Sequence, residues 1–132
     1  MLADVLIADD QAGIRHVLSE VFSGDGYLVE TASNGIEALK KVAANPPLLI
    51  LLDMKMPFLN GLETLAELRK IARDVPVVMM TAYGEMDFLA EVQELGVRHY
   101  INKPFDLDEV RYLIKGLIEE EKTRRREQKR IG

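Results

Sequence analysis

Short apolar segments alternate along this chain with longer segments in which apolar residues recur every three or four positions. Five of the short segments are expected to form β-strands: Val5–Ala8, Leu28–Thr31, Leu48–Leu52, Val77–Thr81 and His99–Asn102. Leu48–Leu52 is apolar at every position, and such continuous hydrophobicity is typical of a strand that is covered on both faces. The pattern therefore predicts a parallel β-sheet with helices on both sides.

A helix is expected after each strand, because the apolar residues there lie on one face at helical spacing. The first helix is expected to end at Gly24. The second should follow a cap at Asn34 and stop before Pro46, and the third and fourth should cover Leu62–Ile71 and Met86–Leu95. The last should run from Asp106 to Ile118 or beyond. If the last helix continued to Arg130, its final turns would extend past the sheet. Regular alternation of strands and helices predicts an α/β fold with right-handed crossovers.

Length and composition describe one globular domain. The chain has 132 residues, of which 48% are hydrophobic and 30% charged, and it has no cysteine. These values exclude a multidomain enzyme, a disulfide framework and a cysteine-based zinc site. The N-terminus lacks the basic segment of a signal peptide, and no apolar run reaches the roughly 18 residues that a membrane span requires. We therefore expect a soluble, cytoplasmic protein with no membrane partner.

Charge is distributed unevenly along the chain. Residues 1–121 contain 11 basic and 21 acidic residues, a net charge of −10, whereas residues 122–132 contain six basic residues and one acidic residue, a net charge of +5. No aromatic platform or recognition helix accompanies these basic residues, so a solvated helix end is favoured over a nucleic-acid-binding site. We expect a domain at 1–121, followed by a basic tail or helix extension at 122–132.

Polar side chains follow four of the predicted strands, at the edge where parallel strands end. They are Asp9 and Asp10 after the first strand, Asp53 after the third, Thr81 at the end of the fourth and Lys103 after the fifth. Ligands bind at this edge in open α/β sheets. Taken singly, each acid is equally well explained as a turn residue or a helix cap.

Taken together, the three carboxylates need a cation. Two unit charges 4 Å apart repel by roughly 4 kcal/mol at an effective dielectric constant of 20, and Lys103 supplies only one positive charge. A site that offers oxygen ligands and keeps several waters is typical of Mg²⁺. The sequence therefore predicts Mg²⁺ as the cofactor.

Four segments around these residues carry a family resemblance. They are ADDQAGIR at 8–15, LLDMKMP at 51–57, MTAYGEMD at 80–87 and INKPFDLDEVR at 101–111. In order and spacing they resemble the receiver domain of two-component response regulators, and the resemblance extends from residue 4 to about residue 120. Within this family the chain is most similar to the single-domain receivers of the sporulation phosphorelay. The resemblance implies a flavodoxin-like (βα)5 fold with the sheet order 2-1-3-4-5.

The resemblance also implies roles for the acidic residues. Asp53 would accept a phosphoryl group and become an aspartyl phosphate. Asp10, Asp53 and the backbone carbonyl of Lys55 would bind Mg²⁺, and Asp9 would hold a water molecule of the metal. A carboxylate and an incoming phosphoryl group are both anionic, and a bridging Mg²⁺ permits the attack of one on the other.

Further roles that the resemblance implies concern Lys103, Thr81 and Tyr100. Lys103 would pair with one phosphoryl oxygen, and Thr81 would donate a hydrogen bond to another. Tyr100 matches an aromatic position that packs inward in many receivers when the threonine moves toward the phosphate, which would make Thr81 and Tyr100 a switch. The alternative is that Tyr100 is an ordinary half-buried strand residue.

A docking surface for a four-helix bundle that bears phosphohistidine is expected around the acceptor. Its candidate residues are Gln11, Gly13, Ile14, Leu18, Tyr83, Pro104 and Phe105. Ile14 and Leu18 are equally compatible with a place in the core, because they lie on the apolar face of the first helix.

The function that these observations favour is that of a single-domain response regulator in a phosphorelay. It would catalyse its own phosphorylation, taking a phosphoryl group from a histidine kinase onto Asp53 with Mg²⁺ and passing it to a histidine phosphotransferase, with a phosphatase as a further candidate partner. One alternative is a diffusible binding module switched by phosphorylation. Another is a receiver fragment of a DNA-binding response regulator, in which residues 122–132 begin a linker.

Overall fold

The computed structural model describes residues 2–82 and 86–131. Its strands are β1 (Val5–Ala8), β2 (Val29–Ala32), β3 (Leu49–Asp53), β4 (Val77–Thr81) and β5 (His99–Asn102). They form one parallel sheet in the order β2-β1-β3-β4-β5. The predicted α/β class and the sheet order are both confirmed.

Two predicted strands, the second and the third, begin and end one residue later than expected. Leu28 lies before β2, where its carbonyl oxygen accepts hydrogen bonds from the backbone N–H groups of Asp4 and Val5. The third strand, β3, ends one residue later than expected because Asp53 still pairs with Met80 of β4. Asp53 is therefore the last residue of a buried strand, and the sheet holds its backbone in place.

Helices connect the strands, as the apolar periodicity predicts. They are α1 (Ala12–Gly24), α2 (Gly35–Ala44), α3 (Gly61–Ile71), the short 3₁₀ helix η1 (Met86–Phe88), α4 (Leu89–Glu94) and α5 (Leu107–Ile131). The predicted fourth helix is split into η1 and a short α4, and only Val92 of α4 is buried. None of the described helices combines the length and the low charge that crossing a membrane requires.

Polar side chains cap three of these helices. The Asn34 side chain accepts a hydrogen bond from the backbone N–H of Glu37, as expected from the sequence. Asn60 and Glu63 form a reciprocal capping box at the start of α3. Asp106 accepts hydrogen bonds from the first turn of α5.

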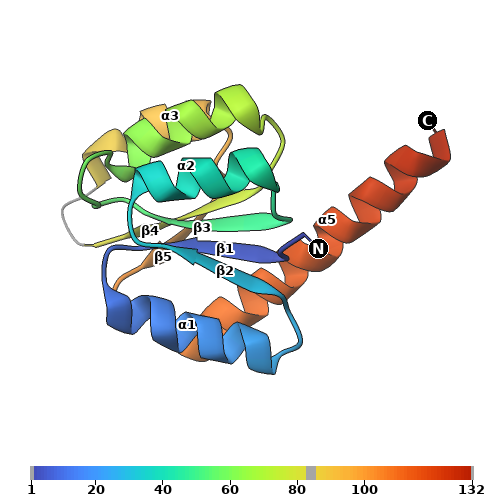
Figure 1. The fold of residues 1–132 in the computed structure, drawn as a ribbon, viewed down its shortest axis with the longest axis horizontal. Helices are drawn as coiled ribbons and strands as arrows, with labels where there is room; N and C mark the ends of the chain where they lie inside the picture. The colour runs from blue at the N-terminus through green and yellow to red at the C-terminus, as the bar shows by residue number, and fades with distance from the viewer. Residues whose placement is uncertain (1, 83–85, 132) are drawn as a thin grey trace.

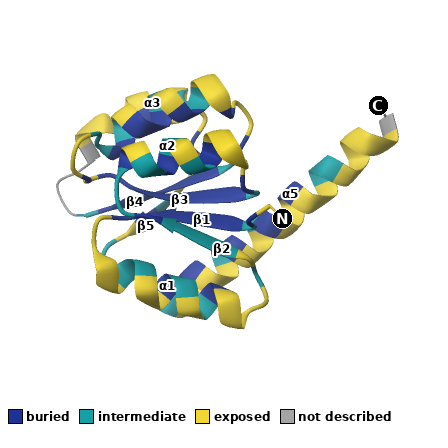
Figure 2. Ribbon diagram, in the orientation of Figure 1, coloured by how far each residue is buried: buried dark blue, intermediate teal, exposed yellow. Residues whose placement is uncertain are grey.

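Successive strand residues point to opposite faces of the sheet and build two separate cores. On β1, Leu6 and Ala8 belong to the core beneath α2, α3 and α4, whereas Val5 and Ile7 belong to the core beneath α1 and α5. Figure 1 shows these two helical layers, and Figure 2 shows the buried strands between them. Burial on both faces explains why β1, β3 and β4 read as continuous apolar runs, whereas β2 and β5 are more exposed.

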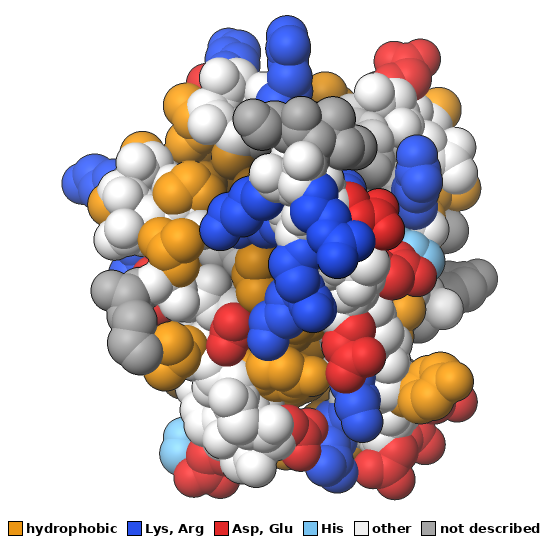
Figure 3. Space-filling model, turned by 90° about the vertical axis from the view of Figure 1, so that its right-hand side faces the viewer, with side chains coloured by type: hydrophobic (Ala, Val, Ile, Leu, Met, Phe, Trp, Pro, Cys, Tyr) orange, Lys and Arg blue, Asp and Glu red, His pale blue; other side chains and the backbone are white. Residues whose placement is uncertain are grey.

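The last helix, α5, continues far beyond the apolar stripe that predicts it. It is 25 residues long, and its end extends away from the domain (Figure 1). Glu121 is only 4% exposed and accepts hydrogen bonds from the side chains of Arg124 and Arg125. Burial disfavours the ionised form of Glu121, but these two arginines outweigh it and lower the pKa of its carboxyl. Figure 3, which looks toward the end of α5, shows the basic side chains gathered around it.

Replacing Glu121 is expected to loosen the end of α5. In Glu121→Gln the two arginines lose their buried counter-charge, at a cost of about 1 kcal/mol because both are partly exposed. The fraction of molecules in which the end of α5 is unfolded should rise about fivefold. Tryptic cleavage between residues 122 and 130, followed by mass spectrometry, measures it. Glu120→Gln, at an exposed neighbouring acid, is the matched control, and equal cleavage rates in both variants would contradict the expectation.

Candidate active site

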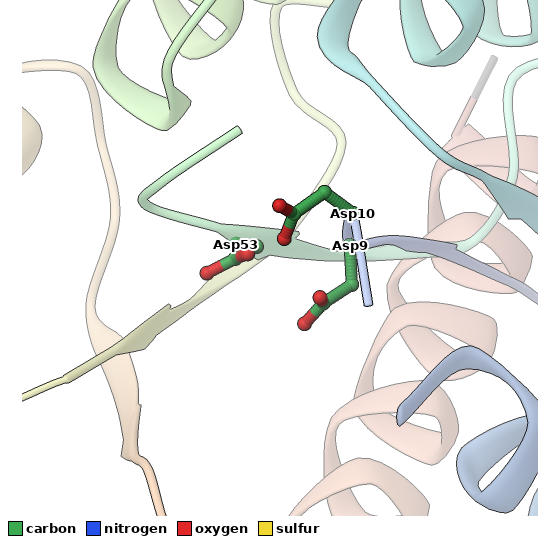
Figure 4. Close-up of side chains that lie close together, drawn as sticks. All are labelled: Asp9, Asp10 and Asp53. Atoms are coloured by element: carbon green, nitrogen blue, oxygen red, sulfur yellow. The ribbon is translucent and has the colours of Figure 1, made fainter. Parts of the chain in front are cut away.

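The three acids predicted from the strand ends lie together at one edge of the sheet. Asp9 directly follows β1, Asp10 comes next, and Asp53 ends β3 (Figure 4). One carboxylate oxygen from each residue lies within 4.8 Å of the other two. Asp9 and Asp53 are buried, whereas Asp10 is exposed, so the cluster is closed toward the sheet and open toward solvent.

The ammonium group of Lys103 lies between two of these carboxylates. Its Nζ donates a hydrogen bond to Asp9 Oδ2 at 2.7 Å and lies 3.2 Å from Asp53 Oδ1. The backbone N–H of Lys103 donates to the carbonyl oxygen of Thr81 at 2.7 Å, and this holds the lysine beside β4. The peptide bond between Lys103 and Pro104 is cis. One ammonium group compensates one of three carboxylate charges.

Burial is the main reason why the Asp53 carboxyl is difficult to ionise. Together with the charge of Asp9, it raises the pKa of Asp53 to about 7, although Lys103 acts in the opposite direction. Burial also disfavours the charged form of Lys103, but the hydrogen bond to Asp9 and the charge of Asp53 outweigh it and raise the pKa of the lysine. The site therefore holds a permanent cation and still has excess acid that a further cation would stabilise.

The β1–α1 loop is held in place through Asp9. Its Oδ1 accepts from the backbone N–H of Gln11 at 2.9 Å, and Lys103 occupies its Oδ2, so both carboxylate oxygens accept hydrogen bonds from the protein. The guanidinium of Arg15 donates to the backbone carbonyl of Asp9 at 2.7 Å. This role of Arg15 was missed in the sequence, where only its place in the first motif is visible.

A groove of about 610 Å³ opens above the acids. It is lined by Asp10, Gln11, Asp53, Lys55, Met56, Pro57, Ala82 and Lys103. Asp53 lies on its floor and is only 3% exposed. A reacting group must therefore enter the groove to reach this carboxylate.

The first residue of α3, Gly61, packs against the backbone at the end of β3. A methyl group on Gly61 would lie 2.6 Å from the carbonyl oxygen of Asp53 and 2.6 Å from the Cα of Met54. Its backbone N–H donates to the carbonyl oxygen of Met54 at 2.7 Å. Only glycine permits this approach. The sequence shows the Asn60-Gly61 pair, but the reason for the glycine lies in this contact.

Comparison with known proteins gives the family. A family model described as response regulator receiver domain matches residues 5–115. The chain is 47% identical over 111 residues to sporulation initiation phosphotransferase F of Bacillus subtilis (strain 168), which corresponds to 84% of this chain and 90% of that protein. This chain belongs to the response regulator receiver domain family.

Other relatives of this receiver include longer proteins and solved structures. The receiver is 36% identical over 115 residues to the regulatory protein AtoC of Escherichia coli (strain K12), which is 87% of this chain but 25% of AtoC. A CheY-like receiver domain structure from Methanospirillum hungatei JF-1 superposes with a TM-score of 0.87 at 27% identity, covering 94% of this chain and 99% of the other. The receiver resemblance drawn from the four motifs is confirmed.

The two residues predicted as a switch in this receiver line the same small cavity. Thr81 is buried at the end of β4, and its hydroxyl lies 3.3 Å from Asn102 Oδ1. Tyr100 is half-buried on β5, and its hydroxyl donates to the carbonyl oxygen of Val97 at 3.3 Å. Both residues line a cavity of about 10 Å³, together with Met54 and other apolar side chains. This arrangement brings the pair together at one cavity.

Most of the predicted docking residues of the receiver reach the surface near the groove. Gln11, Gly13 and Pro104 are exposed. Ile14 and Phe105 are half-buried and pack against the core beneath α1 and α5. These five residues are accessible to differing degrees, and their role in docking stays a prediction.

Two other docking residues have different outcomes. Leu18 has no exposed surface and lies in the core beneath α1, so its prediction as a partner contact was wrong. It precedes Phe22 by four residues, and both are turned toward the sheet on the same face of α1. Tyr83 lies outside the described residues.

Proposed function

We propose that this receiver accepts a phosphoryl group on Asp53 from a histidine kinase and passes it to a histidine phosphotransferase. The observation that carries the proposal is the placement of Asp53 on the floor of a groove, with two further carboxylates and an ammonium group around it. The same carboxylate can serve as nucleophile toward a phosphohistidine and as leaving group when an unphosphorylated histidine of the next protein attacks the aspartyl phosphate, because the two reactions are the same phosphoryl exchange run in opposite directions.

Mg²⁺ fits the chemistry of this donor set. The ligands would be Asp10, Asp53 and the backbone carbonyl of Lys55, all of them oxygens. Asp9 would act through a water molecule, which agrees with the two hydrogen bonds that its carboxylate oxygens already accept. When bound, the ion supplies positive charge to the oxygens that the transferred group brings into the site.

The remaining chemistry belongs to the side chains around Asp53. An Asp53 oxygen bonds to phosphorus as the phosphorus–nitrogen bond of the donor's phosphohistidine breaks, and the electron pair of that bond stays on the imidazole. Lys103 is 3.2 Å from Asp53 and pairs with a phosphoryl oxygen of the product. The Thr81 hydroxyl donates a hydrogen bond to a second phosphoryl oxygen. The receiver therefore assists its own phosphorylation.

A conformational response to phosphorylation is proposed for Thr81 and Tyr100. If Thr81 moves toward the phosphoryl group, it leaves space beside the cavity that it shares with Tyr100. The phenol ring is then free to pack further inward, which would alter the surface at β5. The competing interpretation of Tyr100 as an ordinary half-buried residue predicts no such movement.

The assignment to a relay is supported by the similarity to sporulation initiation phosphotransferase F, 90% of which this chain covers. We propose that residues 1–121 form the receiver unit and that residues 122–132 extend its last helix. A phosphatase partner and a cytoplasmic location stay predictions from the sequence. The matches to longer DNA-binding regulators keep the regulatory-domain alternative open.

Phosphoryl transfer from a kinase to this chain and from this chain to a phosphotransferase tests this function. The chain is incubated with a panel of purified histidine kinases that carry labelled phosphohistidine, and the phosphorylated product is then mixed with a purified histidine phosphotransferase. A relay protein is expected to take up label from at least one kinase and to lose it to the phosphotransferase within minutes. Uptake without onward transfer would instead favour a binding module or a regulatory domain.

A further inference from the structure

Phe58, in the loop between β3 and α3, has an unfavourable backbone conformation. Its φ is +70°, and it is the only residue other than glycine with a positive φ in the described part of the chain. The backbone N–H of Leu59 donates to the carbonyl oxygen of Pro57 at 2.9 Å, so Phe58 is the central residue of a γ-turn. A positive φ at this position of a γ-turn is rare and strained, above all for a large side chain.

The aromatic ring of Phe58 also lacks the burial that usually compensates such strain. Phe58 is 78% exposed, and it belongs to neither of the two cores described above. Glycine would adopt the same φ without strain and would place no apolar surface in water. The strained backbone and the exposed ring therefore both make phenylalanine unfavourable at this position in the isolated receiver.

Neighbouring residues hold the ring outward. Met56 is buried in the core beneath α2, α3 and α4. On the other side, Leu59 packs against α2, because its Cβ lies 3.0 Å from the position that a Cβ on Gly35 would occupy. The loop is thus anchored before and after Phe58, and the ring cannot turn into the core without breaking one of these contacts.

The anchored loop forms one rim of the groove above Asp53. Met56 and Pro57, the two residues before Phe58, line that groove. Because Asp53 is only 3% exposed, a histidine side chain must enter the groove to react with it, and the protein that bears this histidine must then cover the rim. Phe58 lies at the edge of the area that such a protein has to cover.

We propose that Phe58 is an anchor residue that inserts into an apolar recess beside the phosphohistidine of the partner protein and selects that partner. This inference rests on the proposed function, since it names a contact made during the same phosphoryl transfer. Exposed aromatic side chains that become buried are typical centres of binding energy at protein interfaces. The strain at φ +70° keeps the ring extended before the partner arrives, which reduces the ordering that binding requires.

Comparison of a protein donor with a small donor tests the proposal. The kinase that labels the wild-type chain fastest, chosen from a panel of purified histidine kinases, serves as the protein donor, and acetyl phosphate serves as the small one. The measured quantity is the ratio of the two phosphorylation rates. We expect this ratio to fall about tenfold in Phe58→Gly and in Phe58→Asn, because glycine and asparagine tolerate a positive φ but provide no aromatic ring. In Phe58→Tyr the ratio should stay near that of the wild type. Ile71→Ala, at the exposed far end of α3, is the control and should leave the ratio unchanged.

Thermal unfolding of the same variants separates docking from a structural role. The melting temperature of Phe58→Gly should be at least that of the wild type, and up to a few degrees higher, because strain is removed. An unchanged ratio of rates, or a clear fall in melting temperature, overturns the role of Phe58 as an anchor while leaving the proposed function intact. If acetyl phosphate labels the wild-type chain but no kinase does, the proposed function fails, and the docking inference fails with it.

Discussion

Asp53→Ala is expected to accept no phosphoryl group from acetyl phosphate, whereas the wild-type chain should gain one per molecule in the presence of Mg²⁺. The substitution removes the oxygen that would bond to phosphorus, and neither neighbouring acid is placed as Asp53 is. Asp10 is exposed at the rim of the groove, and both oxygens of Asp9 accept hydrogen bonds from the protein. Intact-protein mass spectrometry measures the gain directly.

Two controls make this result specific to the site. Asp25→Ala changes an acid at the end of α1 that pairs with Arg111, away from the groove, and it should be labelled like the wild type. Removal of divalent metal with a chelator should stop labelling of the wild-type chain, because the incoming phosphoryl group then meets uncompensated carboxylates. Label that persists in Asp53→Ala would show that the acceptor is another residue.

The second large effect concerns stability without metal. Asp53→Asn is expected to be more stable than the wild type at pH 8 by about 1–2 kcal/mol, because it removes a buried charge beside Asp9. The sign follows from the pKa of Asp53, which is raised to about 7 in the folded chain, against roughly 3.9 in the unfolded chain. Between these values the folded state binds more protons, so stability is lost as the pH rises from about 4 to above 7. The pKa of about 7 already includes the opposing effect of Lys103.

Urea denaturation of both proteins between pH 5 and pH 8 measures this difference. The difference between the two stabilities should shrink as the pH falls from 8 to 5, since it vanishes only below about pH 4, where Asp53 is protonated in both the folded and the unfolded wild type and resembles asparagine in charge. Millimolar Mg²⁺ at pH 8 should raise the stability of the wild type and have less effect on Asp53→Asn, since a cation bound only to the folded state shifts the equilibrium toward it. Asp74→Asn, at an exposed acid, serves as the matched control. Parallel pH profiles for the wild type and Asp53→Asn would refute the raised pKa.

Much of the candidate site could be predicted because its residues follow buried strands. Asp53 ends a run of four apolar residues, and Asp9 and Asp10 follow another such run, so hydrophobicity alone indicates that they share an edge of the sheet. The chemical reason for grouping them, repulsion among carboxylates, is also available from residue types. The sheet order that brings β1 beside β3 came from the family resemblance and not from the pattern.

Other features depend on contacts between residues far apart in the chain. Leu18 was predicted either as a docking residue or as part of the core, because its position on the apolar face of α1 does not reveal how much of its surface remains exposed. Glu121 reads as one more acid in a polar helix, yet it is buried with two arginines. Phe58 gives no sign in the sequence of its positive φ, because neighbours packed on α2 and in the core impose it.

By itself, the sequence determined the five strands, most of their boundaries, the helix cap at Asn34 and the acids at the strand ends, since apolar periodicity and capping act over a few neighbouring residues. Only the tertiary structure decided that Lys103 Nζ lies 2.7 Å from Asp9, that α5 continues past the domain and that Phe58 points into solvent beside the groove. These features arise from packing between segments distant in the chain, and local patterns carry no information about which of those segments meet.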